Sequence, residues 1–142
     1  MSDIVHDLKL ACSPAEAYAA VATDRGIKGW WSKNSDIASG VGETHTLRFQ
    51  KDDRAVTMKF RIDALEEGRR VAWTCTENDN PVWPTTRLRF DIEPDGDGTR
   101  LRFQHTGFKE GTSPPYKMTV DGWPHFMASL KAYVETGKGM PA

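Results

Sequence analysis

The sequence predicts one α+β domain over residues 1–142: a strand, two short helices, a run of five or six antiparallel strands and a long C-terminal helix. Two observations predict this class. Apolar residues in the middle of the chain recur at every second position, which is typical of half-buried strands. The helical patterns stand outside this region, near the start of the chain and at its end. Segregated strands and helices favour an α+β domain over an alternating α/β one.

The chain begins with a strand and a well-marked helix start. Residues 4–10 alternate between apolar and polar phases, which predicts a half-buried strand. In the stretch "SPAEAY", Ser13 can cap a helix, Pro14 suits its first position and Glu16 completes a capping box. These signals together predict a helix over residues 14–22.

A second short helix and three tryptophans follow from the same kind of pattern. The "TD" pair at 23–24 can cap a helix that runs toward Trp30. Two consecutive tryptophans cannot both face one core on helix or strand geometry. One of Trp30 and Trp31 is therefore expected to pack inside, and the other to lie at a cavity mouth or a dimer surface. Trp83, between two prolines, is expected to anchor a strand-entry loop, and the alternative is that it contacts a ligand or partner.

The middle of the chain reads as an antiparallel meander. Its segments keep a period of two and are separated by turn residues, of which "PDGDG" is a clear hairpin signal. Alternate residues are expected to point into the core in five segments: 45–49, 56–62, 71–75, 88–92 and 101–105.

The C-terminal segment predicts the helix that covers this sheet. Its apolar residues follow a helical stripe: Trp123, Phe126, Met127, Leu130 and Val134. Gly137 is the expected C-cap, because glycine readily adopts the left-handed conformation that ends a helix. Pro124 leaves two alternatives open: it starts this helix, or it kinks a longer helix that begins near Tyr116.

These features resemble a known superfamily. The element order, the stretch "SPAEAYAAV", the tryptophan pair before a glycine-rich strand entry, and "GW…SLKAYVETGKG" are similar to SRPBCC proteins. That superfamily includes START lipid-transfer domains, plant pathogenesis-related allergens and polyketide cyclases. The chain looks most like its AHSA-like branch, named for the activator of Hsp-ninety ATPase homologue. The resemblance covers nearly the whole chain and implies a helix-grip fold: a curved antiparallel sheet of six to seven strands wrapped around the C-terminal helix.

A helix-grip fold implies a cavity between sheet and helix, and such cavities are common ligand sites. The expected ligand is a small apolar molecule. The alternative is that the same side chains fill a solid core. The candidate ligand-binding residues are Trp31, Phe49, Met58, Phe60, Trp73, Phe90, Phe103, His105, Trp123, Phe126, Met127 and Leu130.

Three histidines share the apolar phase of their strands, namely His6, His45 and His105. An imidazole in an apolar space can orient a carbonyl group or act as an acid or base near neutral pH. His105 is the strongest candidate, because the loop at 107–115 can cover it. The alternative is that each ring reaches solvent or a backbone partner. No other residue is a candidate for catalysis.

The sequence lacks the motifs that mark several kinds of functional site. The chain has no HxH or HExxH pair, so no metal site is expected. It has no GxSxG elbow and no histidine beside Cys12 or Cys75, and its glycines match neither a dinucleotide nor a phosphate-binding loop. No cofactor is expected.

Charge and composition exclude further classes. The formal net charge is −1, which argues against a nucleic-acid binder or a polybasic membrane anchor. The beginning of the chain lacks a signal-peptide pattern, and the two cysteines lack a disulfide framework. We expect a cytoplasmic monomer or homodimer with no membrane segment. On the outer face, Arg87 and Arg89 are expected across a hairpin from Arg100 and Arg102, in a cluster of guanidinium groups.

The leading functional hypothesis is therefore a protein that binds a small hydrophobic ligand between its sheet and its C-terminal helix. One alternative is an enzyme of the polyketide-cyclase or hydrolase type that uses the same cavity. Another is a co-chaperone-like module that binds proteins through its surface.

Overall fold

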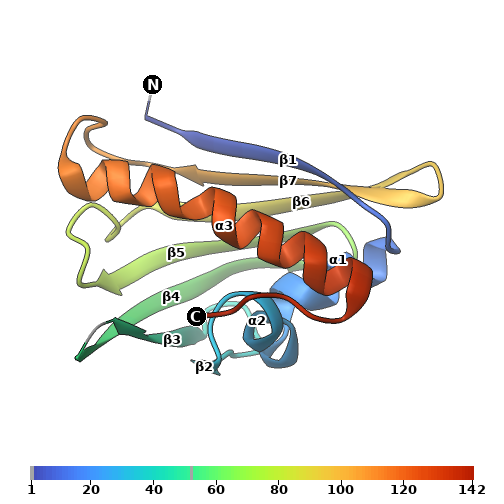
Figure 1. The fold of residues 1–142 in the computed structure, drawn as a ribbon, viewed down its shortest axis with the longest axis horizontal. Coiled ribbons are helices and arrows are strands. Elements are labelled where there is room, and N and C mark those ends of the chain that lie inside the picture. Colours follow the sequence, from blue (N-terminus) through green and yellow to red (C-terminus); the bar gives the residue numbers. More distant parts are fainter. Residues whose placement is uncertain (1, 52) are drawn as a thin grey trace.

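The computed structural model describes residues 2–51 and 53–142, and these form one sheet with three helices (Figure 1). The strands are β1 (Ile4–Leu10), β2 (Asn34–Asp36), β3 (Thr44–Lys51), β4 (Arg54–Glu66), β5 (Arg70–Asn78), β6 (Arg87–Asp95) and β7 (Gly98–Thr106). The helices are α1 (Pro14–Ala22), α2 (Asp24–Trp30) and α3 (Pro114–Thr136).

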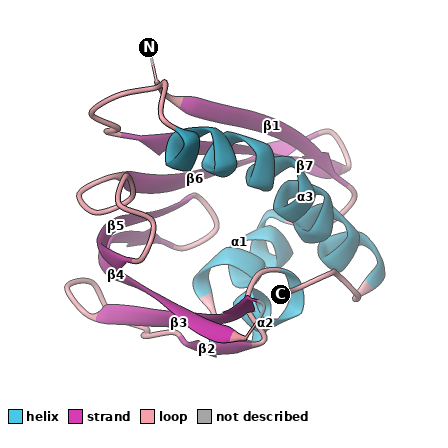
Figure 2. Cartoon of the chain, turned by 60° about the vertical axis from the view of Figure 1, so that its left-hand side comes forward, coloured by secondary structure: helices cyan, strands magenta, loops and turns pink. Residues whose placement is uncertain are grey.

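The seven strands form an antiparallel sheet in the order β1-β7-β6-β5-β4-β3-β2. From β2 to β7 each strand pairs with the next in sequence, and β1 then joins the free side of β7. The sheet curves around α3, while α2 lies beside β2 and α1 packs against β5, β6 and β7 under the second half of α3 (Figures 1 and 2). The predicted α+β class and helix-grip architecture are confirmed.

The caps of the first two helices agree with the sequence signals. The Ser13 hydroxyl accepts a hydrogen bond from the Glu16 N–H at 3.1 Å, and the Glu16 carboxylate accepts one from the Ser13 N–H at 3.1 Å. The Thr23 hydroxyl likewise accepts from the Gly26 N–H at 3.0 Å and starts α2. A Cβ at Gly26 would lie 2.4 Å from the Ala19 carbonyl oxygen, so a glycine is needed where α2 passes α1.

The two alternatives for Pro124 resolve in favour of the longer helix. Ser113 caps α3, and Pro124 lies inside the helix. Because proline has no N–H, the carbonyl four residues earlier loses its helical partner, and such positions bend helices. The axis of α3 changes direction along its length (Figure 2). Gly137 ends the helix with φ of 84°, as predicted.

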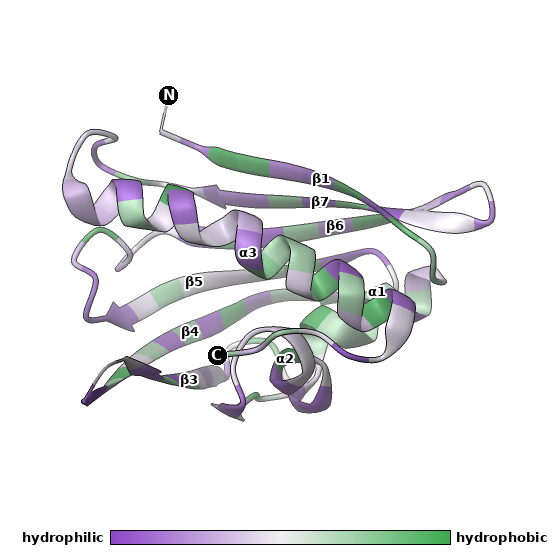
Figure 3. Ribbon diagram, in the orientation of Figure 1, coloured by the Kyte–Doolittle hydropathy of each residue, from purple (hydrophilic) through white to green (hydrophobic). Residues whose placement is uncertain are grey.

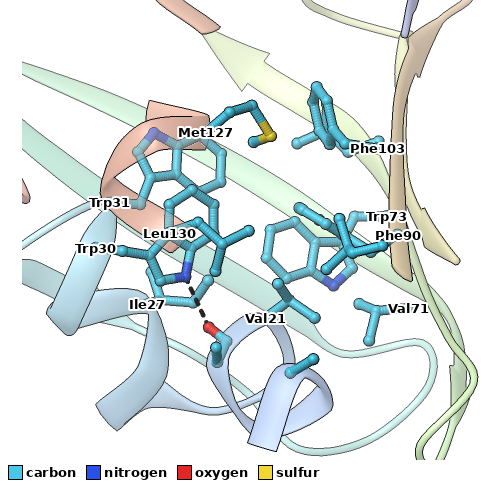
Figure 4. Close-up of a cluster of buried hydrophobic side chains, with 14 of the residues drawn as sticks. Val21, Ile27, Trp30, Trp31, Val71, Trp73, Phe90, Phe103, Met127 and Leu130 are labelled. Carbon is cyan, nitrogen blue, oxygen red and sulfur yellow. Dashed lines mark hydrogen bonds between the residues drawn. The ribbon is translucent and has the colours of Figure 1, made fainter. Parts of the chain in front are cut away.

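Both tryptophans of the consecutive pair are buried, so the expectation that only one packs inside is wrong, although Trp31 also borders the pocket described below. Trp30 and Trp31 are 0% and 1% exposed, and their rings stack with centroids 5.6 Å apart. The indole N–H of Trp30 donates to the Ala20 carbonyl at 2.8 Å (Figure 4). The pair is buried on all sides because the chain leaves α2 between α1, the sheet and α3. Hydrophobic residues also gather where the second half of α3 passes over α1 (Figure 3).

The predicted cluster of four arginines does not form on the outer face of the sheet. Arg100 stands opposite Glu93, and Arg102 stands opposite Asp91, so arginines of β7 face acids of β6. Arg102 also forms an ion pair with Asp7 of β1, with an N–O distance of 2.9 Å. The tight β6–β7 turn sets this register, which removes the like-charge contacts that would otherwise cost stability.

Candidate ligand-binding pocket

A pocket of about 530 Å³ opens at the end of the concave face that α1 and α2 leave uncovered. The ends of β3, β4 and β5 form one side, the segment between β5 and β6 forms a second, and the first half of α3 forms a third. Most of the wall is aromatic, aliphatic or thioether surface, and polar and charged side chains, among them Arg54 and Asp79, form the rest.

Five of the predicted ligand-binding residues line this pocket: Trp31, Phe49, Met58, Trp123 and Phe126. Trp31 connects its two sides. The Trp31 ring lies 6.2 Å from Phe49 on the sheet, and 5.3 Å from Trp123 and 6.4 Å from Phe126 on α3. These rings therefore form a continuous aromatic floor that reaches from β3 to the helix.

The other seven predicted residues lie in the packed interior and do not border the pocket. Each is at most 2% exposed: Phe60, Trp73, Phe90, Phe103, His105, Met127 and Leu130. The sheet and the second half of α3 are in direct contact through them (Figure 4). The concave face is thus solid at one end and open at the other.

Some pocket residues were not among the sequence predictions. Arg54 and Val56 continue the alternation of β4 toward its beginning, which is a signal that could have identified them. Met118 lies on α3 more than one turn before the predicted stripe, and Gly122 directly precedes its first residue, Trp123. The residues between β5 and β6 carry no periodicity, so no sequence signal places them at the wall.

Asn80 holds the wall between β5 and β6 against α3. Its side-chain N–H₂ group donates to the Pro115 carbonyl at 3.1 Å and to the Thr119 hydroxyl at 3.4 Å. The indole N–H of Trp83 donates to the same hydroxyl at 2.8 Å, which confirms Trp83 as a structural anchor. These bonds fix one side of the pocket.

His105 lies behind the pocket wall, fully buried, and both of its ring nitrogens are engaged. Trp123 donates its indole N–H to Nδ1 at 3.1 Å, so the neutral ring carries its proton on Nε2. Nε2 then donates to the Thr86 hydroxyl at 2.8 Å, and that hydroxyl donates to the Trp83 carbonyl at 2.5 Å. Burial lowers the pKa of His105 to about 3. The ring ties β7 to α3 and to the entry of β6.

His45 occupies a second buried position, near the β2 end of the sheet. Its Nδ1 accepts a hydrogen bond from the Ala38 N–H at 2.9 Å, and its ring meets the Trp73 ring edge-on at 4.5 Å. Burial lowers the pKa of His45 to about 4. His6 is half-buried, with its ring 6.3 Å from that of Phe103. None of these three histidines is among the residues that line the pocket.

The thiols and acidic groups offer little further chemistry. Cys12 and Cys75 are free and buried, and burial raises the pKa of the Cys75 thiol to about 12.

Among residues 2–51 and 53–142, no three His, Cys, Asp or Glu side chains gather in a way that could hold a metal ion. In the same residues, no helix is both long and apolar enough to span a membrane.

The family model described as "Activator of Hsp90 ATPase homolog 1-like protein" matches residues 11–135. The chain belongs to this family. This result confirms the SRPBCC and AHSA-like resemblance, and the matched region contains all the pocket residues except Ala142.

Solved structures related to this AHSA1-like chain share its fold. The Aha1 dimer from Colwellia psychrerythraea is 29% identical, with a TM-score of 0.79 over 98% of this chain and 100% of that one. A protein from Chromobacterium violaceum is 20% identical, with a TM-score of 0.78 over 94% and 97% of the two chains. DynU16, from the dynemicin biosynthetic locus, is 17% identical, with a TM-score of 0.78 over 98% and 49%. No curated protein sequence matches the chain significantly.

Proposed function

We propose that the protein binds a small hydrophobic molecule in the pocket between the sheet and the first half of α3. The observation that carries this proposal is the aromatic floor, where Trp31 joins the sheet to the helix beneath a volume of about 530 Å³. Pockets of roughly 300–1,000 Å³ with mainly apolar walls are typical of small-molecule sites.

The composition of the wall suits a ligand with an aromatic or branched apolar body. The half-buried rings of Phe49 and Phe126 can stack on such a body and release water from it. Trp31 is only 1% exposed and is stacked on Trp30 and Trp73, so it supports these rings and offers the ligand little surface of its own. Met58 and Met118 add flexible thioether surface that adapts to different shapes. Because His105 is buried with both nitrogens engaged, binding is better supported than the cyclase- or hydrolase-type alternative.

Gly122 provides the test of this proposal. It lies on α3 in the pocket wall, and a Cβ built there meets no atom within 4 Å. Gly122→Phe should therefore fill the pocket without disturbing the core. We expect a panel of apolar compounds to raise the melting temperature of the unmodified protein, through preferential binding to the native state, and to lose this effect in Gly122→Phe.

Two matched variants control for side effects of the added ring. Gly122→Ala changes the same position but leaves the pocket open. Asp121→Phe adds the same ring at the adjacent exposed residue, which does not line the pocket. Both should keep the ligand-induced shift. Equal shifts in Gly122→Phe and the unmodified protein would show that the compounds bind elsewhere.

We also infer that the protein assembles as a homodimer. The support is the relative from Colwellia psychrerythraea, which is described as a dimer and aligns over 98% of this chain.

A further inference from the structure

Arg54 is a positively charged residue on the inner face of the sheet. In the β3–β4 register, Phe49 stands opposite Val56, and Leu47 stands opposite Met58, with both pairs on the concave side. Side chains two residues apart on a strand share a face. Arg54 therefore continues the inward phase of Val56 and Met58, and it lines the pocket where β4 begins.

The ionic surroundings of Arg54 differ from those of several arginines on the outer face. There, Arg61, Arg89 and Arg102 form ion pairs with acidic residues on the same face of the sheet. Within the described part of the chain, Arg54 forms no ion pair. Its guanidinium group thus brings to the pocket wall N–H donors that no acidic side chain of the described residues pairs.

We propose that the pocket selects an amphipathic monoanion, whose apolar body lies on the aromatic floor and whose carboxylate pairs with Arg54. This inference rests on the proposed function and specifies its ligand class. A guanidinium group binds a carboxylate through two parallel N–H···O bonds, which makes arginine well suited to this task. Trp31, Phe49 and Phe126, which form the aromatic floor, line the same pocket.

Asp79 is the acidic side chain of the pocket wall, and it opposes this selection. It is exposed on the segment after β5, where water and salt weaken its effect. Arg54 is held in the β3–β4 ladder, in the same inward phase as the apolar wall of the pocket. Arg54 is exposed as well, so the difference between the two is its inward position beside the apolar wall and not weaker screening, and Asp79→Asn should strengthen binding of an anion.

Isothermal titration calorimetry with matched probes tests the inference. The first set is 2-naphthoate, 2-naphthylmethanol and 2-naphthylmethylamine, and the second is dodecanoate, dodecan-1-ol and dodecylamine below their critical micelle concentrations. Comparison of the two sets distinguishes an aromatic ligand from an acyl chain. We expect the carboxylate of the preferred set to bind about tenfold more tightly than its alcohol, because a hydrogen bond to a charged group is stronger than a neutral one.

Arg54→Gln should lower the affinity for the carboxylate to that of the alcohol and leave the alcohol unchanged. Arg87→Gln is the matched control: it removes the same charge from an exposed position on the outer face, where no ion pair is formed within the described chain. It should change neither affinity. Added salt should weaken binding of the carboxylate alone.

Each other outcome has a definite meaning. Equal affinities for carboxylate and alcohol, or tighter binding of the amine, would overturn the anion inference and leave the pocket proposal standing. Carboxylate binding that is unchanged in both Arg54→Gln and Gly122→Phe would place the anion outside this pocket and contradict both proposals. Failure of every probe to bind the unmodified protein would also contradict both.

Discussion

His45 and His105 both extend from the sheet into the interior, where each has at most 1% of its surface exposed. The sequence identified their inward phase but not their surroundings. The Trp123 indole and the Thr86 hydroxyl reach His105 from elements that are distant in sequence. An inward histidine of a strand can thus be a ligand contact or a structural link, and only its partners distinguish the two.

The lowered pKa values of these two histidines predict a pH dependence of stability. The folded values, about 4 for His45 and about 3 for His105, lie below the unfolded value of 6.5. As the pH falls below about 6.5, the unfolded chain takes up protons first. The free energy of unfolding should therefore decrease by about 1.4 kcal/mol per pH unit for each histidine.

Urea unfolding between pH 7 and pH 5 measures this slope. His45→Asn keeps an acceptor for the Ala38 N–H and should reduce the slope by about half, since one of the two titrating rings is gone. A flat profile in the unmodified protein would show that neither buried ring resists protonation.

At the scale of elements, the sequence predicted the helices and longer strands well, because caps and periodicity are local. The capping box of α1 and the Gly137 stop of α3 appear where they were expected. The strand β2 (Asn34–Asp36) was missed, because three residues show no alternation and form a strand only by pairing with β3. The length of α3 was left open, because Pro124 is compatible with a helix start and with a bend.

Two helical glycines illustrate opposite roles and give a stability prediction. Gly122→Ala should stabilise the protein by about 0.5–1 kcal/mol, because alanine favours the helix and its Cβ meets no atom within 4 Å. Gly26→Ala should destabilise it, because the Cβ would lie 2.4 Å from the Ala19 carbonyl oxygen. Melting curves of both variants without ligand test this contrast. A loss of stability in Gly122→Ala would contradict the open space seen at the pocket wall.

At the scale of the whole molecule, the family relationship leads to a prediction about assembly. One chain has a mass of 15.9 kDa, so a homodimer should have twice that mass in solution. Size-exclusion chromatography with light scattering measures this mass directly, and dilution shows whether the assembly dissociates. A mass of one chain at all accessible concentrations would contradict the homodimer inferred from the Colwellia psychrerythraea relative.

The sequence by itself determined the class of fold, its family and the inward phase of each long strand. The fold class and the inward phases depend on patterns within about ten residues, and the family depends on short motifs that resemble it. It also selected five residues of the pocket wall, although it placed them in the same set as seven residues of the solid core.

The tertiary structure alone decided where the concave face is open. That depends on how far α3 stays in contact with a curved sheet, and on Asn80, which holds the wall between β5 and β6 against this helix. It also brought Arg54 from the start of β4 to the rim of this opening. Such placements arise from contacts between residues distant in sequence, which a local pattern cannot encode.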